Sequence, residues 1–272
     1  MRGIDLDLDR VPEALLAPLR GRADLGRAGN GILADPVAVE LIARFDPDFW
    51  RRRAPLDAET NLPWLARARQ FDDRIREFLS RQPDGTVVNL GAGLDTTFAR
   101  IDNGRCRWFD LDLPEVIDLR RALIPETDRS TCVAARVLEV DWMNRLPPTE
   151  DGSLLFVAGG VLGCHAELAV AEWFREMGRR FIGAEIVFDA MTPAAVRKAN
   201  RRLRGGDAEA ARLRWGLKVA RVLQTWPARL QVVEQFELFR GLDLRGMPAG
   251  LRVRAFANRL FRDLTVVRCR WI

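Results

Sequence analysis

The chain has 272 residues, of which 48% are hydrophobic, and its formal net charge is +5. A chain of this length and composition can bury a full core, and it favours one α/β domain with additions over two independent domains. The longest uncharged apolar run, residues 154–164, is too short to span a bilayer, and the acidic first ten residues do not resemble a signal peptide. We therefore expect a cytoplasmic protein with no membrane partner.

Few side chains are available for metal or nucleophilic chemistry. The four cysteines, at 106, 132, 164 and 269, show no C-x-x-C spacing, the only histidine is His165, and tyrosine is absent. A histidine-rich metal site and a tyrosine base are therefore excluded, and we expect neither a metal nor a disulfide.

Arginine supplies almost all of the positive charge, since lysine occurs only at positions 198 and 218. The arginine clusters at 51–53, 179–180 and 201–204 lie in a chain where acidic residues are interleaved throughout. We interpret them as solvated helix faces, and we expect no nucleic-acid partner.

The N-terminal part of the chain is predicted to be helical. The stretch before Asp35 has weak periodicity and predicts a loose arm with one short helix. Asp35 is a capping residue for a helix over 36–45, and apolar residues at spacings of three and four predict a longer helix over 63–79. We expect residues 1–82 to form a helical cap on the main domain, residues 83–272.

A glycine turn after a buried strand is the most informative feature. Thr86–Leu90 is short and rich in β-branched residues, as in the central strand of a parallel sheet. Gly91 and Gly93 follow, and glycine lets the backbone turn tightly and approach a ligand closely. Asp95 or Thr96 then caps a short helix whose amide groups point back toward the turn.

A carboxylate stands at the end of the next predicted strand. Residues 106–109 lead into Asp110-Leu111-Asp112, and Asp112 lies 21 positions after Gly91. That separation suits a carboxylate that binds two ribose hydroxyls. The spacing does not choose between a dinucleotide and a nucleoside such as S-adenosylmethionine, although a dinucleotide site normally has a third glycine where this chain has Thr96. An ordinary strand turn is a third interpretation.

Three stretches carry a resemblance to a known family. VVNLGAGLDTTFAR, WFDLDLPEVIDLRR and the preceding RARQFDDRIREFL resemble the leucine carboxyl methyltransferases and the tetracenomycin-type polyketide O-methyltransferases. The similarity runs from about Pro63 to the end of the chain, and the first sixty residues match poorly.

The resemblance implies S-adenosylmethionine as the cofactor, bound by residues 83–272. It implies an α/β fold with a Rossmann-like, seven-stranded, mostly parallel sheet and a C-terminal antiparallel hairpin. A helical N-terminal cap and a helical lid over about 193–226 complete the expected fold.

The same resemblance implies roles for single residues. Arg67 corresponds to the arginine that binds the cofactor's carboxylate, Asp141 to an acid near the adenine amino group, and Trp142 to the residue beside the adenine ring. A carboxylate can accept a hydrogen bond from the amine, and an indole can stack on the base. Gly159 stands where many relatives have a glutamate, and Cys164 where they have a tyrosine. The missing carboxylate puts in doubt one contact to the methionine part of the cofactor, which backbone carbonyls near Gly159 could replace.

The remaining predicted elements complete the sheet. Strands are expected over 135–140, 154–158 and 184–190, with the terminal hairpin over 230–238 and 264–271. Trp215 and Trp226, in the predicted lid, either line a substrate pocket or lie in the core.

His165 follows the fourth predicted strand, whose carboxyl end should open onto the active cleft. It is a candidate catalytic general base, and a structural role is its alternative. A carboxylate acceptor needs no base, whereas a phenol or alcohol benefits from one. We expect an S-adenosylmethionine-dependent O-methyltransferase acting on a carboxyl or hydroxyl group of a small molecule or peptide. The alternatives are a cofactor-binding regulatory protein that has lost turnover at Gly159, and an NAD-dependent oxidoreductase.

Overall fold

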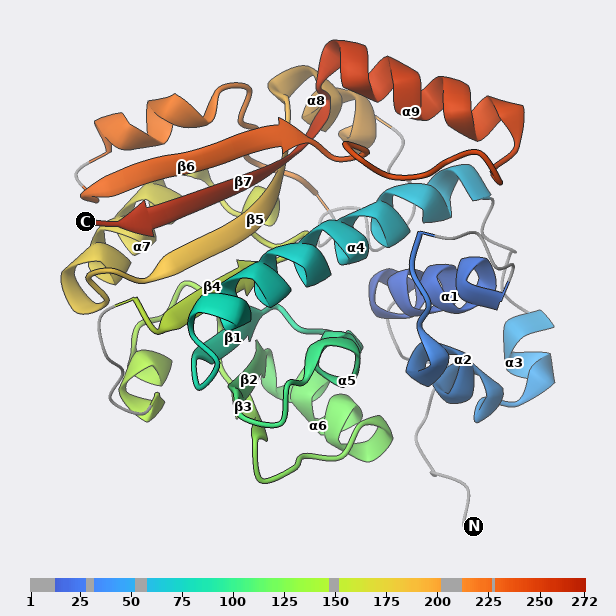
Figure 1. The fold of residues 1–272 in the computed structure, drawn as a ribbon, viewed down its shortest axis with the longest axis horizontal. Coiled ribbons are helices and arrows are strands. Elements are labelled where there is room, and N and C mark those ends of the chain that lie inside the picture. The colour runs from blue at the N-terminus through green and yellow to red at the C-terminus, as the bar shows by residue number, and fades with distance from the viewer. Residues whose placement is uncertain (1–12, 28–31, 52–57, 147–151, 202–211, 227) are drawn as a thin grey trace.

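A computed structural model describes residues 13–27, 32–51, 58–146, 152–201, 212–226 and 228–272. A seven-stranded sheet in the order β3-β2-β1-β4-β5-β7-β6 lies at its centre, with helices on both faces (Figure 1). Strand β7 runs antiparallel to both of its neighbours, and the other pairs are parallel. The predicted mostly parallel sheet with a terminal hairpin is confirmed. The strands are β1 (Thr86–Leu90), β2 (Arg107–Asp112), β3 (Ser130–Ala134), β4 (Leu154–Ala158), β5 (Glu185–Met191), β6 (Leu230–Glu237) and β7 (Leu264–Trp271).

Local sequence explains where several helices begin. Asp35 accepts a hydrogen bond from Ala38 N at the start of α2, and Thr192 accepts one from Ala195 N at the start of α8. Proline occupies the first turn of both helices, where its missing N–H costs nothing. The α-helices are α1 (Glu13–Arg27), α2 (Pro36–Ala43), α3 (Pro47–Arg51), α4 (Ala58–Arg81), α5 (Thr97–Ile101), α6 (Pro114–Leu123), α7 (Glu167–Arg180), α8 (Pro193–Asn200) and α9 (Ala249–Phe261), and the 3₁₀ helices are η2 (Asp141–Arg145), η3 (Leu162–Cys164) and η4 (Ala220–Thr225).

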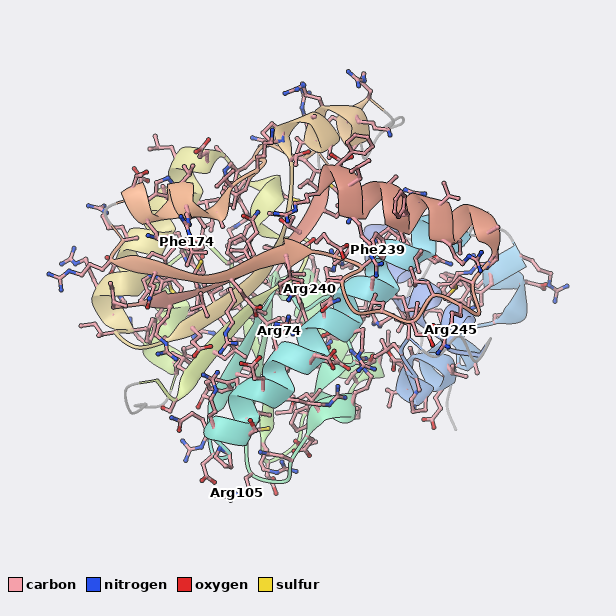
Figure 2. All side chains as sticks on the ribbon, turned by 45° about the horizontal axis from the view of Figure 1, so that its top comes forward. Arg74, Arg105, Phe174, Phe239, Arg240 and Arg245 are labelled. Atoms are coloured by element: carbon pink, nitrogen blue, oxygen red, sulfur yellow. The ribbon has the colours of Figure 1, made fainter. Side chains whose placement is uncertain are left out.

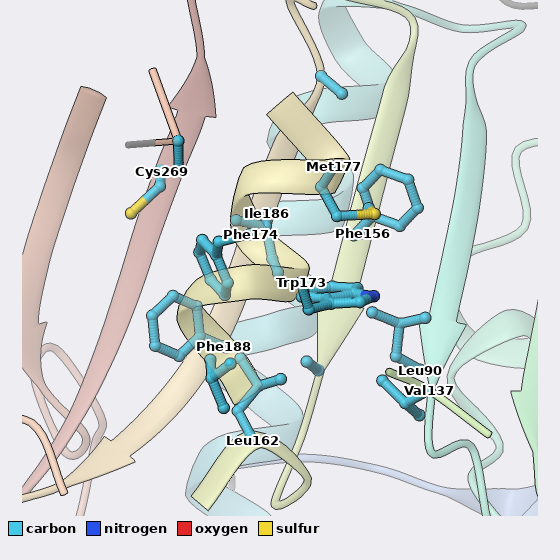
Figure 3. Close-up of a cluster of buried hydrophobic side chains, with 14 of the residues drawn as sticks. Leu90, Val137, Phe156, Leu162, Trp173, Phe174, Met177, Ile186, Phe188 and Cys269 are labelled. Atoms are coloured by element: carbon cyan, nitrogen blue, oxygen red, sulfur yellow. The ribbon is translucent and has the colours of Figure 1, made fainter. Parts of the chain in front are cut away.

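Both faces of the sheet are buried, because alternate strand residues enter two different hydrophobic clusters. On one face, Phe156 and Phe188 pack with Phe174 of α7 (Figure 3). On the other face, Val87 and Val187 belong to a cluster that includes residues of α4 and α9. Helices therefore cover both faces of the central strands, whose ends remain as the place where a ligand can bind.

A third cluster joins helices α1, α2, α3 and α6 beside the sheet. Figure 1 shows α1, α2 and α3 grouped beside α4, away from the β6–β7 edge. Buried charges reinforce this junction, since Asp35 Oδ2 accepts hydrogen bonds from Arg22 (3.0 Å), Thr96 (2.6 Å) and Arg100 (2.7 Å). Arg100 also donates two hydrogen bonds to Asp72 of α4, at 2.9 and 3.0 Å. The N-terminal helices are thus fastened to the segment that follows the glycine turn.

The third strand lies earlier in the sequence than predicted. Strand β3 covers Ser130–Ala134, not residues 135–140. Its register pairs Asp112 of β2 with Ala134, and the chain then leaves the sheet in a turn in which Glu139 N donates to Arg136 O. The sequence-based prediction failed because Ser130 and Thr131 are polar, whereas the apolar residues beyond Ala134 lie in the turn and not in the strand.

The predicted lid is helical only in part among the residues that the structure describes. Helix α8 ends at Asn200, residues 202–211 lie outside the described part, and 212–219 form no helix before η4 begins. Trp215 and Leu217 are buried in the core cluster, because this stretch is held to the sheet end by the bond from Leu217 N to Met191 O. Trp226 packs at the edge of the same cluster, so both tryptophans are core residues.

Arginines are spread over the surface and mostly paired. Arg105 and Arg245 lie far apart in Figure 2, and each forms an ion pair with a nearby aspartate, Asp84 and Asp243 respectively. Arg74 and Arg240 both approach the ring of Phe236, at 4.4 and 5.6 Å from its centroid. Among the described helices, none is long and apolar enough to cross a membrane.

Candidate active site

The glycine turn after β1 has the conformation that the sequence predicts. Gly91 and Gly93 both have positive φ, +65° and +48°, a region that favours glycine. A Cβ at Gly91 would overlap Cγ2 of Val161, whereas a Cβ at Gly93 would meet only Leu15 at 3.4 Å. Gly91 N and Ala92 N both donate to Leu111 O, at 2.7 and 3.0 Å, which ties the turn to the end of β2.

Asp112 lies at the end of β2, directly against the turn. Its Oδ2 accepts from Gly93 N and its Oδ1 from Leu113 N, both at 2.7 Å. Burial raises the pKa of the Asp112 carboxyl, and these two N–H donors oppose that effect. Each carboxylate oxygen keeps a further lone pair for a ligand hydroxyl, so the geometry suits the ribose contact predicted from the sequence.

A buried arginine that the sequence did not reveal as a site residue donates hydrogen bonds to the backbone of the turn. Arg120 of α6 donates to the carbonyls of Gly93 (3.0 Å) and Asp95 (2.7 Å) and to Asp110 Oδ2 (2.6 Å). Its side chain is 3% exposed. The arrangement fixes the turn on both sides, which prepares it to receive a ligand without reorganisation. Position alone gives no signal for this role, because Arg120 looks like one of many helix arginines.

Asp95 is part of the site wall, but its charge is already compensated within the protein. Its carboxylate lies 3.9 Å from both Arg22 and Arg100 and accepts a hydrogen bond from Asn89 at 3.2 Å. Burial acts to raise its pKa, yet Arg22 and Arg100 outweigh this and lower the pKa to about 2. The residue at the N-cap of α5 is Thr96, whose hydroxyl donates to Asp35.

Arg67, Gly159 and Gly160 form one corner of the site. Arg67 Nη1 lies 3.2 Å from Asp189 Oδ2, and Asp189 Oδ1 accepts from Gly160 N at 2.6 Å. A Cβ at Gly160 would lie 2.7 Å from Arg67 Nη1, and one at Gly159 would lie 3.1 Å from the ring of Phe71. The two glycines therefore leave the space that the guanidinium occupies.

The structure does not bring Asp141 and Trp142 to this site. Trp142 is 1% exposed in the core, where its indole N–H donates to Val137 O at 3.1 Å, and Asp141 lies in η2, outside the cavity lining. Neither residue lines the cavity, so their predicted contacts to adenine find no support in this structure. Because β3 ends at Ala134, the chain reaches the cleft with residues 135–139 instead, and Glu139 is the carboxylate among them.

His165 follows η3 and is partly buried at the site. Burial lowers the pKa of its imidazole, and the nearby Arg214 lowers it further, so the ring is neutral at pH 7. Burial, together with Asp189, raises the pKa of the neighbouring Cys164 thiol, whose sulfur lies 3.7 Å from Gly160 O. A neutral imidazole can accept a proton, whereas this thiol stays protonated.

One cavity of about 1270 Å³ joins all of these features. Among the predicted site residues, Arg67, Gly91, Gly93, Asp95, Asp112, Gly159 and His165 line it. Residues of the cap also line the cavity, and the sequence did not identify them as site residues: Leu15, Pro18, Leu19, Arg22 and Trp64. Their only signal is apolar spacing in α1 and α4, which any packed helix shares.

Comparison with known proteins identifies the family. A family model described as leucine carboxyl methyltransferase matches residues 16–149. The tetracenomycin polyketide synthesis O-methyltransferase TcmP of Streptomyces glaucescens is 33% identical over 277 residues, covering 96% of this chain and 98% of that protein. The chain belongs to the leucine carboxyl methyltransferase family.

Other comparisons agree with this membership. The S-adenosyl-L-methionine-dependent methyltransferase dpfgK of Gibberella zeae is 26% identical over 212 residues, covering 70% of this methyltransferase and 71% of that protein. The crystal structure of a DUF574 family protein from Streptomyces avermitilis has a TM-score of 0.58 at 14% identity, covering 93% of this chain and 97% of that one, and it supports the fold alone.

Membership resolves one alternative that the sequence left open and corrects one expectation. This methyltransferase depends on S-adenosylmethionine, which decides against the NAD-dependent oxidoreductase. The family match begins at residue 16, so the expectation that the first sixty residues match poorly is corrected.

Proposed function

We propose that this methyltransferase transfers a methyl group to an oxygen atom, in a carboxyl or phenolic hydroxyl group, of a largely apolar, polyketide-like small molecule. The observation that carries the proposal is the single cavity that connects the glycine turn and Asp112 with the apolar cap wall and His165. TcmP, whose name describes an O-methyltransferase of polyketide synthesis, supports the same substrate class.

The residues of the cavity fit the nucleoside part of S-adenosylmethionine. Asp112 binds the ribose hydroxyls, and Gly91 and Gly93 let the ligand approach the backbone without a Cβ in the way. We assign the adenine end to residues 135–139, where the Glu139 carboxylate accepts from the adenine amine. Arg67 binds the carboxylate of the methionine part.

The bound cofactor supplies an electrophilic methyl group on a sulfonium, and the chain's own residues align the acceptor with it. Leu15, Leu19 and Trp64 present an apolar wall that excludes water and holds an aromatic acceptor in place. Alignment of reacting groups can supply about 7 to 11 kcal/mol in well-oriented systems, so no side-chain nucleophile is needed.

His165 distinguishes the two kinds of acceptor. A phenol must lose its proton during transfer, and the neutral imidazole is placed in the cavity wall to accept it. A carboxylate arrives ionised and needs no base. The His165→Gln variant should therefore lose activity on a phenolic acceptor, by about a hundredfold or more, and retain it on a carboxylate.

The test is a methyl-transfer assay with the purified full chain. Labelled S-adenosylmethionine is incubated with a panel of polycyclic aromatic carboxylic acids and phenols, and products are identified by mass spectrometry. We expect the native chain to give product methylated on oxygen. Asp112→Ala should give much less, because it removes the hydrogen bonds to the ribose hydroxyls, and each hydrogen bond to a charged group contributes about 1.5 to 3 kcal/mol to cofactor binding.

Two outcomes would contradict the proposal. Methylation on nitrogen or carbon alone would remove the oxygen acceptor. Tight binding of S-adenosylhomocysteine without turnover on any acceptor, including an extract of small molecules from the source cells, would favour the cofactor-binding regulatory role.

A further inference from the structure

Arg67 is held by a carboxylate from the opposite side of the site. It projects from α4, whereas Asp189 lies on β5, 122 positions later in the chain. The Nη1 to Oδ2 distance is 3.2 Å, and the two side chains are 21% and 18% exposed. Two elements that are distant in sequence thus meet at the cofactor's expected amino-acid end.

The same carboxylate also fixes the backbone under the guanidinium. Asp189 Oδ1 accepts from Gly160 N at 2.6 Å, and Gly160 has the positive φ of +74°. Arg67 lies so close to this glycine pair that a Cβ at Gly160 would come within 2.7 Å of Nη1 and 3.5 Å of Nη2. Asp189 therefore contacts both the Arg67 guanidinium and the Gly160 backbone that packs against it.

Only one edge of the guanidinium is used by the protein. The Nε and Nη2 donors, which together form a bidentate edge, make no hydrogen bond or ion pair with any other residue that the structure describes. Arg67 is one of the residues that line the cavity. A carboxylate is the ligand that matches such a fork.

We propose that Asp189 is a positioning residue, which holds Arg67 by Nη1 so that the Nε and Nη2 edge is ready to bind the carboxylate of S-adenosylmethionine. This inference rests on the proposed cofactor site. Asp189 anchors the arginine from β5, and the absence of a side chain at Gly160 leaves the room that the guanidinium needs. An unanchored arginine would have to lose rotamer entropy when the ligand binds.

The test compares two donors that differ by a single group. S-adenosylmethionine has the carboxylate, and its decarboxylated analogue keeps the amine, the sulfonium and the adenosine. Binding to the full chain is measured by calorimetry for the native protein, Arg67→Ala, Asp189→Ala and the double variant. Arg67→Ala should lower the affinity for S-adenosylmethionine by about tenfold to a hundredfold and should hardly change the affinity for the analogue.

Asp189→Ala should lower the affinity for S-adenosylmethionine by about tenfold, again with little effect on the affinity for the analogue. In the Arg67→Ala background it should add nothing, because its effect passes through Arg67. Asp73→Ala is the matched control, since it removes the aspartate paired with Arg69 on the same helix, outside the cavity lining. That variant should bind both donors as the native chain does.

Three results separate the possible failures. Equal weakening of both donors by Asp189→Ala, or an undiminished effect in the Arg67→Ala background, would mean that Asp189 acts only through the Gly160 backbone and would overturn the inference. If Asp189→Ala bound S-adenosylmethionine more tightly than the native chain, repulsion between Asp189 and the ligand carboxylate would outweigh the positioning of Arg67. That result would also overturn the inference. If the native chain binds neither donor, the proposed function itself fails.

Discussion

The substitution Gly91→Ala tests whether the turn conformation is required. Gly91 has φ of +65°, and alanine in the left-handed region costs about 1 to 2 kcal/mol. The new Cβ would also overlap Val161 Cγ2, and such overpacking costs about 1 to 3 kcal/mol. We therefore expect Gly91→Ala to lower the free energy of unfolding by about 2 to 5 kcal/mol.

Gly104→Ala is the matched control for the backbone contribution. Gly104 also has positive φ, +78°, but nothing lies within 4 Å of its added Cβ. The Gly104→Ala variant should lose only the backbone contribution to the free energy of unfolding, about 1 to 2 kcal/mol. Adding Val161→Ala to Gly91→Ala removes the overlapping methyl, so the double variant should recover part of the difference.

The assay is urea unfolding of each variant, followed by calorimetric titration with S-adenosylhomocysteine. Gly91→Ala should also weaken the ligand, because its turn must shift away from Val161, whereas Gly104→Ala should not. Equal stability losses for Gly91→Ala and Gly104→Ala, or no recovery on adding Val161→Ala, would refute the steric reasoning.

Three further predictions concern the buried charges and the proposed adenine site. Arg100→Met should cost about 3 to 5 kcal/mol in urea unfolding, because it removes one cationic partner from each of two fully buried carboxylates, Asp35 and Asp72. The folded pKa of Asp95, about 2, lies below its unfolded value, so its stabilisation is present above about pH 4 and is lost as the pH falls toward 2. Asp95→Asn should therefore make the acid-induced loss of stability smaller by about 2 kcal/mol, measured by unfolding at pH 4 and pH 2. Glu139→Gln should weaken S-adenosylhomocysteine several-fold, whereas Trp142→Phe should lower the melting temperature and leave the affinity unchanged; the reverse pattern would restore the original adenine assignment.

The parts of the fold that sequence reasoning predicted are those encoded by adjacent residues. The strand before Gly91, the turn and Asp112 lie within one βαβ unit, where turn chemistry and strand composition act locally. The same holds for α2, whose start is marked by Asp35 and the proline after it.

What could not be predicted depends on contacts between distant residues. Strand β3 was misplaced because pairing with β2 outweighed the polarity of Ser130 and Thr131. Trp142 is a core residue because η2 turns it under the sheet, against Phe156, a direction that no spacing reveals. Asp189 and Arg120 have no motif of their own, and only the fold brings them to Arg67 and the glycine turn.

The charge cluster around Asp35 limits how this protein can be recombined with its relatives. Arg22, Asp35 and Asp72 come from the N-terminal helices, whereas Arg100 belongs to the segment after the glycine turn. A chimera joined between α4 and β1 would leave buried charges without partners on both sides of the junction, unless both residues of each ion pair came from the same protein. The helices that shape the acceptor wall and the strands that hold the methyl donor are therefore exchangeable only as a matched set.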